Sequence, residues 1–144
     1  MRVEVSVVIE RSIEEVFAYV ADPENLPEWA STVLEVHKDG SGLLQEGQTF
    51  TSVGKFLGRR LEIPFEVSAH EPPRLHSHRS TGGPIPNEWT LTFEEEQGGT
   101  RYTEVVEGEP GRFFKLVGPL LEAAGRRQLR ADLGTLKDLL EAGS

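Results

Sequence analysis

Turn-forming residues break the middle of the chain at short intervals, and this spacing constrains the fold more than any other feature. Between residues 31 and 107 no stretch shows a helical pattern of useful length. Glycine, proline and short polar residues instead cluster at 39–42, 57–58, 71–73, 81–84 and 97–99. Strong turn formers between short apolar runs are typical of a meander of antiparallel hairpins. The sequence therefore predicts six strands, near 31–38, 47–56, 59–70, 74–81, 87–96 and 100–107.

A strand and two short helices are expected before this meander. Apolar and polar residues alternate over 2–9, which predicts a first strand with one buried face. Ser12 and Glu15 have the spacing of a capping box, so a helix should begin there. Pro23 should end that helix, because proline disfavours the helical conformation in the residue before it. Residues 23–29 then form a second short helix or turn, which places Trp29 at the entry to the sheet.

A long helix should end the chain, over about 112–142. Leu129, Leu133, Leu136 and Leu140 recur at helical spacing and form one apolar stripe. Gly118 and Pro119 should kink or restart the helix. An uninterrupted helix over 119–142 would be ~36 Å long, enough to cross a sheet of this size.

Length and composition indicate one domain that spans residues 1–144. The chain has no cysteine, which excludes disulfides, thiolate-bound metal clusters and a cysteine nucleophile. The same absence fits a reducing compartment, and we expect a cytoplasmic protein. Glutamate is frequent and Asn, Gln and Met are scarce, which is typical of a heat-adapted source.

Charge and hydropathy narrow the classes of partner. The net charge is −9, which argues against nucleic acid, because phosphate backbones attract positive charge. The N-terminus alternates and carries Glu4, unlike the apolar core of a signal peptide. No apolar stretch is long enough to span a bilayer, so we expect no stable membrane insertion. The sequence leaves the oligomeric state open.

The order strand, two short helices, six strands, long helix resembles the START-like helix-grip superfamily. Residues 21–29, 71–74, 99–103 and 133–141 resemble its polyketide cyclase/dehydrase and lipid-transport branch. The resemblance implies an α+β fold in which a curved seven-stranded antiparallel sheet grips the C-terminal helix. It also implies a cavity between sheet and helix for lipids, polyketides or other hydrophobic molecules. It carries over no universal catalytic motif and no cofactor, because one scaffold hosts many activities.

Strand alternation predicts which side chains face the helix across the hollow of the sheet. A shift of one residue in register would reverse each set. Pro64 predicts an edge or a bulge inside the strand over 59–70. The expected inward residues are Leu61, Ile63, Phe65, Val67, Ala69, Leu75, Ser77, Arg79, Trp89, Leu91, Phe93, Tyr102, Glu104 and Val106.

Arg79 and Glu104 stand out on this face, because the other inward residues are mostly apolar. Burying either charge alone is costly, so each should pair with the other or meet a polar group of the ligand. One interpretation is a structural ion pair, or a register that places both in water. The other has Arg79 bind a carboxylate, phenolate or enolate while Glu104 orients it.

The histidines suggest a metal site, which we do not predict. His76 and His78 share one face of their strand, but two imidazoles fall short of a zinc site. Alternation with Leu75 places both on the convex, solvent-facing side. His70 and Glu66 should lie on the outer face by the same argument, so they are not a catalytic dyad.

The first functional hypothesis is binding or transport of a small hydrophobic ligand of lipid, polyketide or aromatic type, with no cofactor and no metal. A second is a cyclase, aromatase or dehydratase in which Arg79 stabilises an enolate and Glu104 or Tyr102 exchanges the proton. A third is a protein-interaction module with a vestigial cavity. The aromatic residues could equally be plain core. The predicted ligand-binding residues are Trp29, Phe65, Arg79, Trp89, Leu91, Phe93, Tyr102, Glu104, Leu121 and Gly125.

Overall fold

The computed structural model describes residues 1–56, 58–109 and 118–143. The predicted start of the last helix, over 112–117, lies outside these residues. The elements are β1 (Arg2–Ile9), α1 (Ile13–Val20), the 3-10 helix η1 (Pro23–Asn25), α2 (Leu26–Trp29), β2 (Val33–Lys38), β3 (Thr49–Phe56), β4 (Arg59–Glu71), β5 (Leu75–Ser80), β6 (Asn87–Glu96), β7 (Gly99–Gly108) and α4 (Gly118–Ala142).

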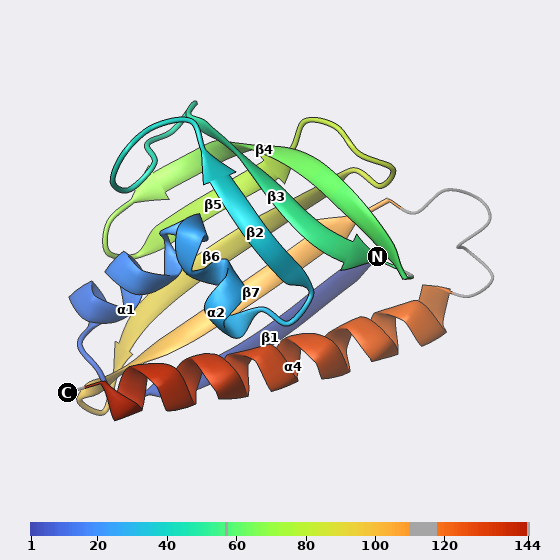
Figure 1. Cartoon of the computed structure of the whole chain (residues 1–144). Coiled ribbons are helices and arrows are strands. Elements are labelled where there is room, and N and C mark those ends of the chain that lie inside the picture. Colours follow the sequence, from blue (N-terminus) through green and yellow to red (C-terminus); the bar gives the residue numbers. More distant parts are fainter. Residues whose placement is uncertain (57, 110–117, 144) are drawn as a thin grey trace.

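The predicted α+β helix-grip fold is confirmed. Seven antiparallel strands form one sheet in the order β1-β7-β6-β5-β4-β3-β2. Figure 1 shows this sheet strongly curved, with α4 along its open side and the short helices beside it. The helix α4 contacts β1 at one edge of the sheet and also α2, which in turn contacts β2 at the other edge. It therefore closes the hollow between the two edge strands.

The short helices begin and end where the sequence predicts. The hydroxyl of Ser12 accepts the Glu15 amide at 3.2 Å, as in a capping box. The same hydroxyl donates to the Glu15 carboxylate at 3.0 Å, so that carboxylate binds the side chain of Ser12 instead of its amide. Helix α1 buries Ile13, Val16 and Phe17 against the sheet.

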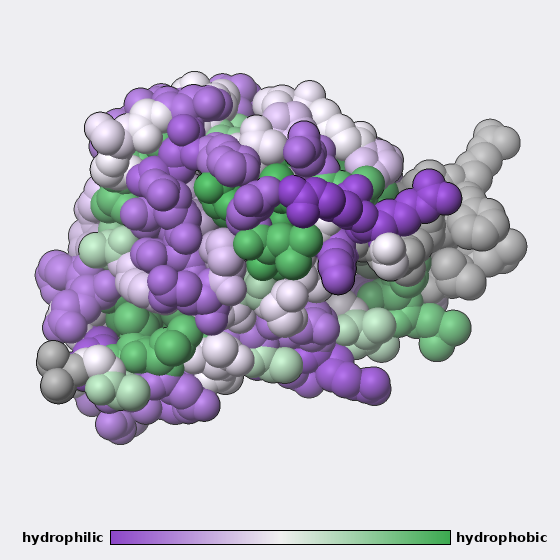
Figure 2. Space-filling view, in the orientation of Figure 1, coloured by the Kyte–Doolittle hydropathy of each residue, from purple (hydrophilic) through white to green (hydrophobic). Residues whose placement is uncertain are grey.

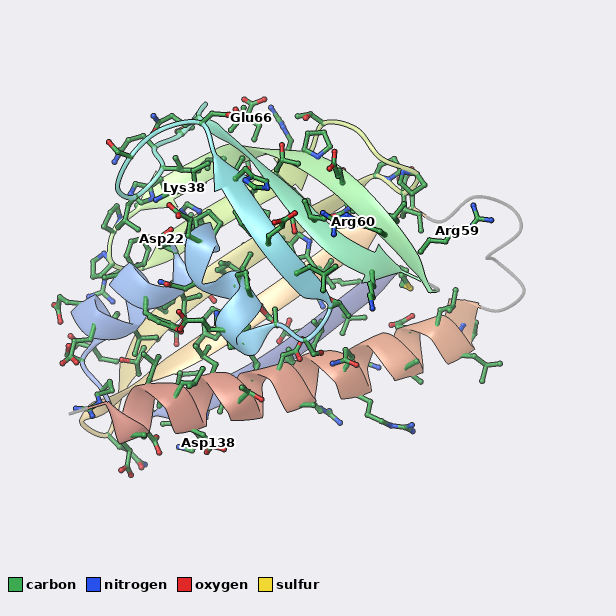
Figure 3. All side chains as sticks on the ribbon, in the orientation of Figure 1. Asp22, Lys38, Arg59, Arg60, Glu66 and Asp138 are labelled. Carbon is green, nitrogen blue, oxygen red and sulfur yellow. The ribbon has the colours of Figure 1, made fainter. Side chains whose placement is uncertain are left out.

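A largely buried ammonium fastens η1 to the end of β2. The side chain of Lys38 is 5% exposed, and its Nζ lies 3.3 Å from Asp22 and 3.0 Å from Glu24. It also donates to the Gly42 carbonyl at 2.6 Å. Figure 3 shows Asp22 and Lys38 side by side at this junction. These contacts hold the helical segment over the neighbouring edge of the hollow.

The leucine stripe of α4 packs on the sheet as predicted. Leu133 and Leu136 are fully buried, and Leu129 and Leu140 are partly buried against the same core. Because a leucine that leaves water contributes about 2 kcal/mol, this stripe is a main attachment of α4.

A bulge in β4 reverses the predicted faces around the β4–β5 hairpin. The register shifts between Val67, which pairs with His78, and Ala69, which pairs with Ser77. A bulge inserts one extra residue, so the inward positions change from odd to even numbers beyond it. The prediction that Ala69, Leu75, Ser77 and Arg79 point inward is therefore wrong.

The edge expected at Pro64 is present on one side of β4, whereas the bulge lies farther along the strand, between Val67 and Ala69. The last pair between β4 and β5 is Phe65 with Ser80, so β4 borders no paired β5 residue at Pro64. Proline is tolerated there because it lacks the amide that such a pair would need.

Candidate functional site

The hollow between sheet and helices contains two adjoining chambers. The inner chamber has a volume of about 100 Å³ and the outer one about 280 Å³. They have in common the five wall residues Thr32, Val33, Ser52, Phe65 and Trp89. The two spaces therefore lie on either side of these five residues.

The two chambers differ in the kind of polar side chain on their walls. The outer chamber is bounded mainly by apolar side chains such as Leu61, Ile63, Ile85 and Val106. The inner chamber also has apolar walls, but polar side chains interrupt them. Besides Thr32 and Ser52, these are the titratable residues His76, His78, Tyr102, Glu104 and Asp132.

Tyr102 and Glu104 form a buried hydrogen-bonded pair on β7. They point to the same side, because they are two residues apart on one strand. The Tyr102 hydroxyl donates to Glu104 Oε2 at 2.8 Å, and both residues are at most 2% exposed. Within the described part of the chain, Glu104 Oε1 has no hydrogen-bond partner.

The carboxyl group of Glu104 is poised between its two protonation states. Burial raises its pKa to about 7; the Tyr102 hydrogen bond opposes this shift, and the charge of Asp132 adds to it. Burial also raises the pKa of Tyr102 well above its usual value, assisted by the nearby Glu104 charge. Tyr102 is therefore a neutral donor throughout the ordinary pH range.

Asp132 connects α4 to the α2–β2 junction beside the inner chamber. Its Oδ1 accepts the Ser31 amide at 3.2 Å and the Ser31 hydroxyl at 2.9 Å. Gln128, one turn earlier on α4, donates to the same oxygen at 3.1 Å and also to the Ser31 hydroxyl. Three donors thus satisfy a carboxylate that is only 5% exposed.

Three histidines form a row on the same concave face, on β4 and β5. The Nδ1 atoms of His70 and His76 are 2.9 Å apart, and the ring centroids of His76 and His78 are 6.2 Å apart. Burial lowers the pKa of His76 to about 4 and that of His78 to about 3, and the neighbouring histidine contributes in each case. Both rings are therefore neutral at pH 7.

The prediction that His70, His76 and His78 face water on the convex side is wrong. His76 and His78 are 2% and 9% exposed, and the His78 ring packs among Phe50, Phe65 and Trp89. The bulge in β4 and the register of the hairpin bring all three to the concave face. His78 Nδ1 has no partner among the described residues.

Arg79 lies outside the site. Its side chain is 56% exposed, and its guanidinium approaches Glu66, its cross-strand partner, at 3.9 Å. Glu66 points away from the hollow (Figure 3). The predicted pairing of Arg79 with Glu104, and any role of Arg79 in binding an anion or an enolate in the cavity, are therefore wrong.

The other predicted ligand residues fall into two groups. Phe93 is buried in the core, with its ring stacked on Tyr102 at 5.1 Å. Leu121 and Gly125 lie on α4 but border neither chamber; Leu129 and Asp132 represent α4 in the inner wall. The predicted residues that line the inner chamber are Trp29, Phe65, Trp89, Leu91, Tyr102 and Glu104.

Sequence reasoning missed Asp132, although the sequence contained a signal for it. Asp132 is three residues after Leu129 and four before Leu136, so it lies on the leucine stripe. A charged residue within an apolar stripe needs a buried partner or a functional reason.

Metal binding and membrane crossing find no support in the described residues. Within these ranges no group of three or more His, Asp or Glu side chains could hold a metal ion. The helices of the same ranges include none that is long and apolar enough to cross a bilayer.

A comparison with protein families shows which family the chain belongs to. The model of the family described as polyketide cyclase/dehydrase and lipid transport matches residues 1–141. The chain belongs to this family. No curated protein matches the chain. The resemblance found in the sequence is thus confirmed over nearly its whole length.

Solved structures show the same fold at low sequence identity. TTHA0849 from Thermus thermophilus is 20% identical over 100% of both chains, with a TM-score of 0.83. A START superfamily protein from Mycobacterium smegmatis is 14% identical over 99% of both chains, with a TM-score of 0.80. DR_A0006 from Deinococcus radiodurans is 21% identical over 100% of this chain and 99% of its own, with a TM-score of 0.76.

Proposed function

We propose that this protein binds a small, mostly apolar molecule in the two adjoining chambers. The observation that carries the proposal is a hollow with apolar walls in which polar atoms of Trp29, His78 and Glu104 have no partner among the described residues. An unpaired buried polar atom costs about 1–3 kcal/mol, which a ligand or a water molecule can recover. Family membership supports hydrophobic ligand binding in general.

The dimensions favour a compact ligand over a long-chain lipid. Pockets for drug-sized molecules have volumes of roughly 300–1,000 Å³, and the two chambers together reach the lower part of that range. A molecule with two or three rings, or a short acyl chain, fits this space. A polar end of such a molecule suits the inner chamber, where Tyr102 and Glu104 can hydrogen-bond to it.

Substitution in the wall that the two chambers share tests the proposal. Ser52 borders both chambers, so Ser52→Phe should reduce the space in both. We expect the wild type to bind the neutral fluorescent probe N-phenyl-1-naphthylamine and this variant to bind it at least tenfold more weakly. The matched control is Thr51→Phe, which adds the same ring on the other face of β3. Equal affinity of the wild type and both variants would place the probe outside the chambers.

A second candidate is cyclase- or dehydratase-type chemistry, and the Glu104 site favours it. A buried carboxyl group with a pKa of about 7 can give and take a proton near neutral pH, as a general acid–base group requires. Neutral His76 lies on the same face two strands away, with Leu91 between them in the register. Conversion of a β-hydroxy thioester should then lose its pH dependence near 7 in Glu104→Gln. Unchanged turnover in that variant would end this assignment.

The third hypothesis, an interaction module, is not supported by the surface. Among the described residues the exposed large apolar side chains are Met1, Leu34, Leu120 and Leu139, which lie in different parts of the fold. Figure 2 shows small hydrophobic patches separated by hydrophilic surface on the side in view. We therefore do not propose a docking role.

A further inference from the structure

We infer that the inner chamber selects ligands whose polar end is an uncharged hydroxyl group and rejects ligands that end in a carboxylate. The inference rests on the proposed function and specifies the ligand of that same site. It is carried by the wall made of Trp29, Tyr102, Glu104 and Asp132.

Trp29 and Glu104, which both line the chamber beside Tyr102, each carry a buried polar atom without a partner among the described residues. Trp29 packs edge-on against Tyr102, with ring centroids 6.5 Å apart and an interplanar angle of 90°. The hydroxyl of Tyr102 donates a hydrogen bond to Glu104 Oε2 at 2.8 Å. Trp29 Nε1 and Glu104 Oε1 are both shielded from solvent and lack a partner among the described residues. Trp29 is 5% exposed and Glu104 is 2% exposed.

The two atoms have complementary requirements. The indole N–H of Trp29 can only donate a hydrogen bond, so it needs an acceptor. The Glu104 carboxylate accepts a hydrogen bond through Oε1, and in its protonated form the carboxyl group can also donate one. A hydroxyl group both donates and accepts, so it meets the requirement of either atom. An ammonium group has no acceptor for Trp29, and a hydrocarbon end leaves both atoms unpaired.

The electrostatics of the wall disfavour an anion. The described residues that line the inner chamber include no lysine and no arginine. Glu104 faces Tyr102 on β7, Asp132 on α4 and, across Leu91, His76 on β5. None of these groups supplies a positive charge at pH 7, because His76 is neutral there. A buried carboxylate would be desolvated beside acidic groups without a counter-ion, which is strongly unfavourable.

Calorimetric titration of the full chain at pH 7 with naphthalene, 2-naphthol and 2-naphthoate tests the inference. The three probes have the same apolar body and differ only at the polar end. We expect 2-naphthol to bind at least threefold more tightly than naphthalene and at least tenfold more tightly than 2-naphthoate.

Two variants test the residues. Glu104→Gln keeps the shape but replaces the acid with an amide that can donate, so the preference for 2-naphthol over 2-naphthoate should fall at least fivefold. Glu107→Gln makes the same change at an exposed position of β7 and should leave that preference within twofold of the wild type. Trp29→Phe removes the N–H and should lower the ratio of 2-naphthol to naphthalene affinity at least threefold.

The outcomes separate the inference from the proposed function. Binding of naphthalene together with 2-naphthoate affinity equal to that of 2-naphthol would overturn the inference and leave the proposed function standing. Failure of all three probes to bind would overturn both. A thermal melt shows whether Glu104→Gln folds. If it does not, the inference is judged on two other results: the preference of the wild type for 2-naphthol over 2-naphthoate, and the ratio of 2-naphthol to naphthalene affinity in Trp29→Phe.

Discussion

At the scale of single residues, the inner chamber disfavours the charged forms of Glu104, His76 and His78, which lowers stability at higher pH through the glutamate and at lower pH through the histidines. Burial raises the pKa of Glu104 and lowers those of His76 and His78. Folding therefore favours proton binding by the glutamate and proton release by the histidines. Stability depends on pH wherever the folded and unfolded chains bind different numbers of protons.

Glu104→Gln should remove a loss of stability that occurs as the pH rises from 4.5 through about 7. Between pH 4.5 and about 7 the folded wild type keeps a proton on Glu104 that the unfolded chain releases. The free energy of unfolding of the wild type thus falls as pH rises through this window. We expect the variant to gain about 3 kcal/mol over the wild type between pH 4 and pH 8, measured by urea unfolding. Glu107→Gln, the exposed control, should show no such gain, and parallel curves for wild type and Glu104→Gln would contradict the prediction.

His78→Leu should protect the chain from acid. Because the pKa of His78 is about 3 in the folded chain, the unfolded chain binds a proton below pH 6.5 that the folded chain does not. The wild type therefore loses stability as pH falls from 6.5. The variant should lose about 2–3 kcal/mol less between pH 7 and pH 4.5, measured by urea unfolding at both values.

The control for His78→Leu is the same substitution at His37, whose side chain is 66% exposed on the outer face of β2. We expect His37→Leu to keep the acid sensitivity of the wild type. An equal acid response in all three proteins would assign the sensitivity to other groups.

At the scale of elements, the attachment of α4 depends on its buried stripe. Leu136 is 0% exposed and Leu139 is 42% exposed, although the two are neighbours on the same helix. Leu136→Ala should lower the free energy of unfolding by about 2–5 kcal/mol, because it leaves a cavity between α4 and the sheet. Leu139→Ala makes the same change on the exposed side and should stay within about 0.5 kcal/mol of the wild type. Urea unfolding at pH 6.5 measures both, and equal losses would refute this orientation of the helix.

The positions of the elements were predictable from the sequence, but the faces of two strands were not. Turn formers end strands locally, so the predicted strand limits lie within two residues of the observed ones. The orientation of β5 depends on the bulge between Val67 and Ala69, which no local signal marks. The prediction took Leu75 as inward because it is apolar, whereas the buried positions hold His76 and His78. A histidine that folding keeps neutral behaves as a core residue, and its hydropathy does not reveal this.

At the scale of the whole molecule, sequence patterns predict that a hollow exists between sheet and helix, but they do not predict its volume or its wall. The order of the elements predicts that α4 lies across a curved sheet, and this is observed. The volume left between them depends on how side chains from distant elements fit together, such as Trp29, Phe65 and Trp89. That fit has no signature in periodicity, so the sequence predicted six residues of the inner wall and missed the rest, among them Asp132, His76 and His78.

Ligand binding should be detectable at the junction of α2 and β2. The amide of Ser31 donates to Asp132, which also lines the inner chamber. Saturation with 2-naphthol should slow hydrogen exchange of the Ser31 amide at least threefold, because an occupied chamber restrains the Asp132 wall. The Glu15 amide, which is bonded to Ser12 and lies at the start of α1, is the internal control. Exchange of Ser31 that is unchanged at saturation would show that chamber and junction are independent.

The position of Asp132 has one more consequence. The Asp132 carboxylate is part of the chamber wall. The same carboxylate also attaches α4 to the α2–β2 junction through its hydrogen bonds to Ser31. Any substitution at Asp132 that changes this wall for a different ligand must therefore also preserve its hydrogen bonds to Ser31. The ligands that this fold can come to bind are therefore limited by the hydrogen bonds that attach α4 to the α2–β2 junction.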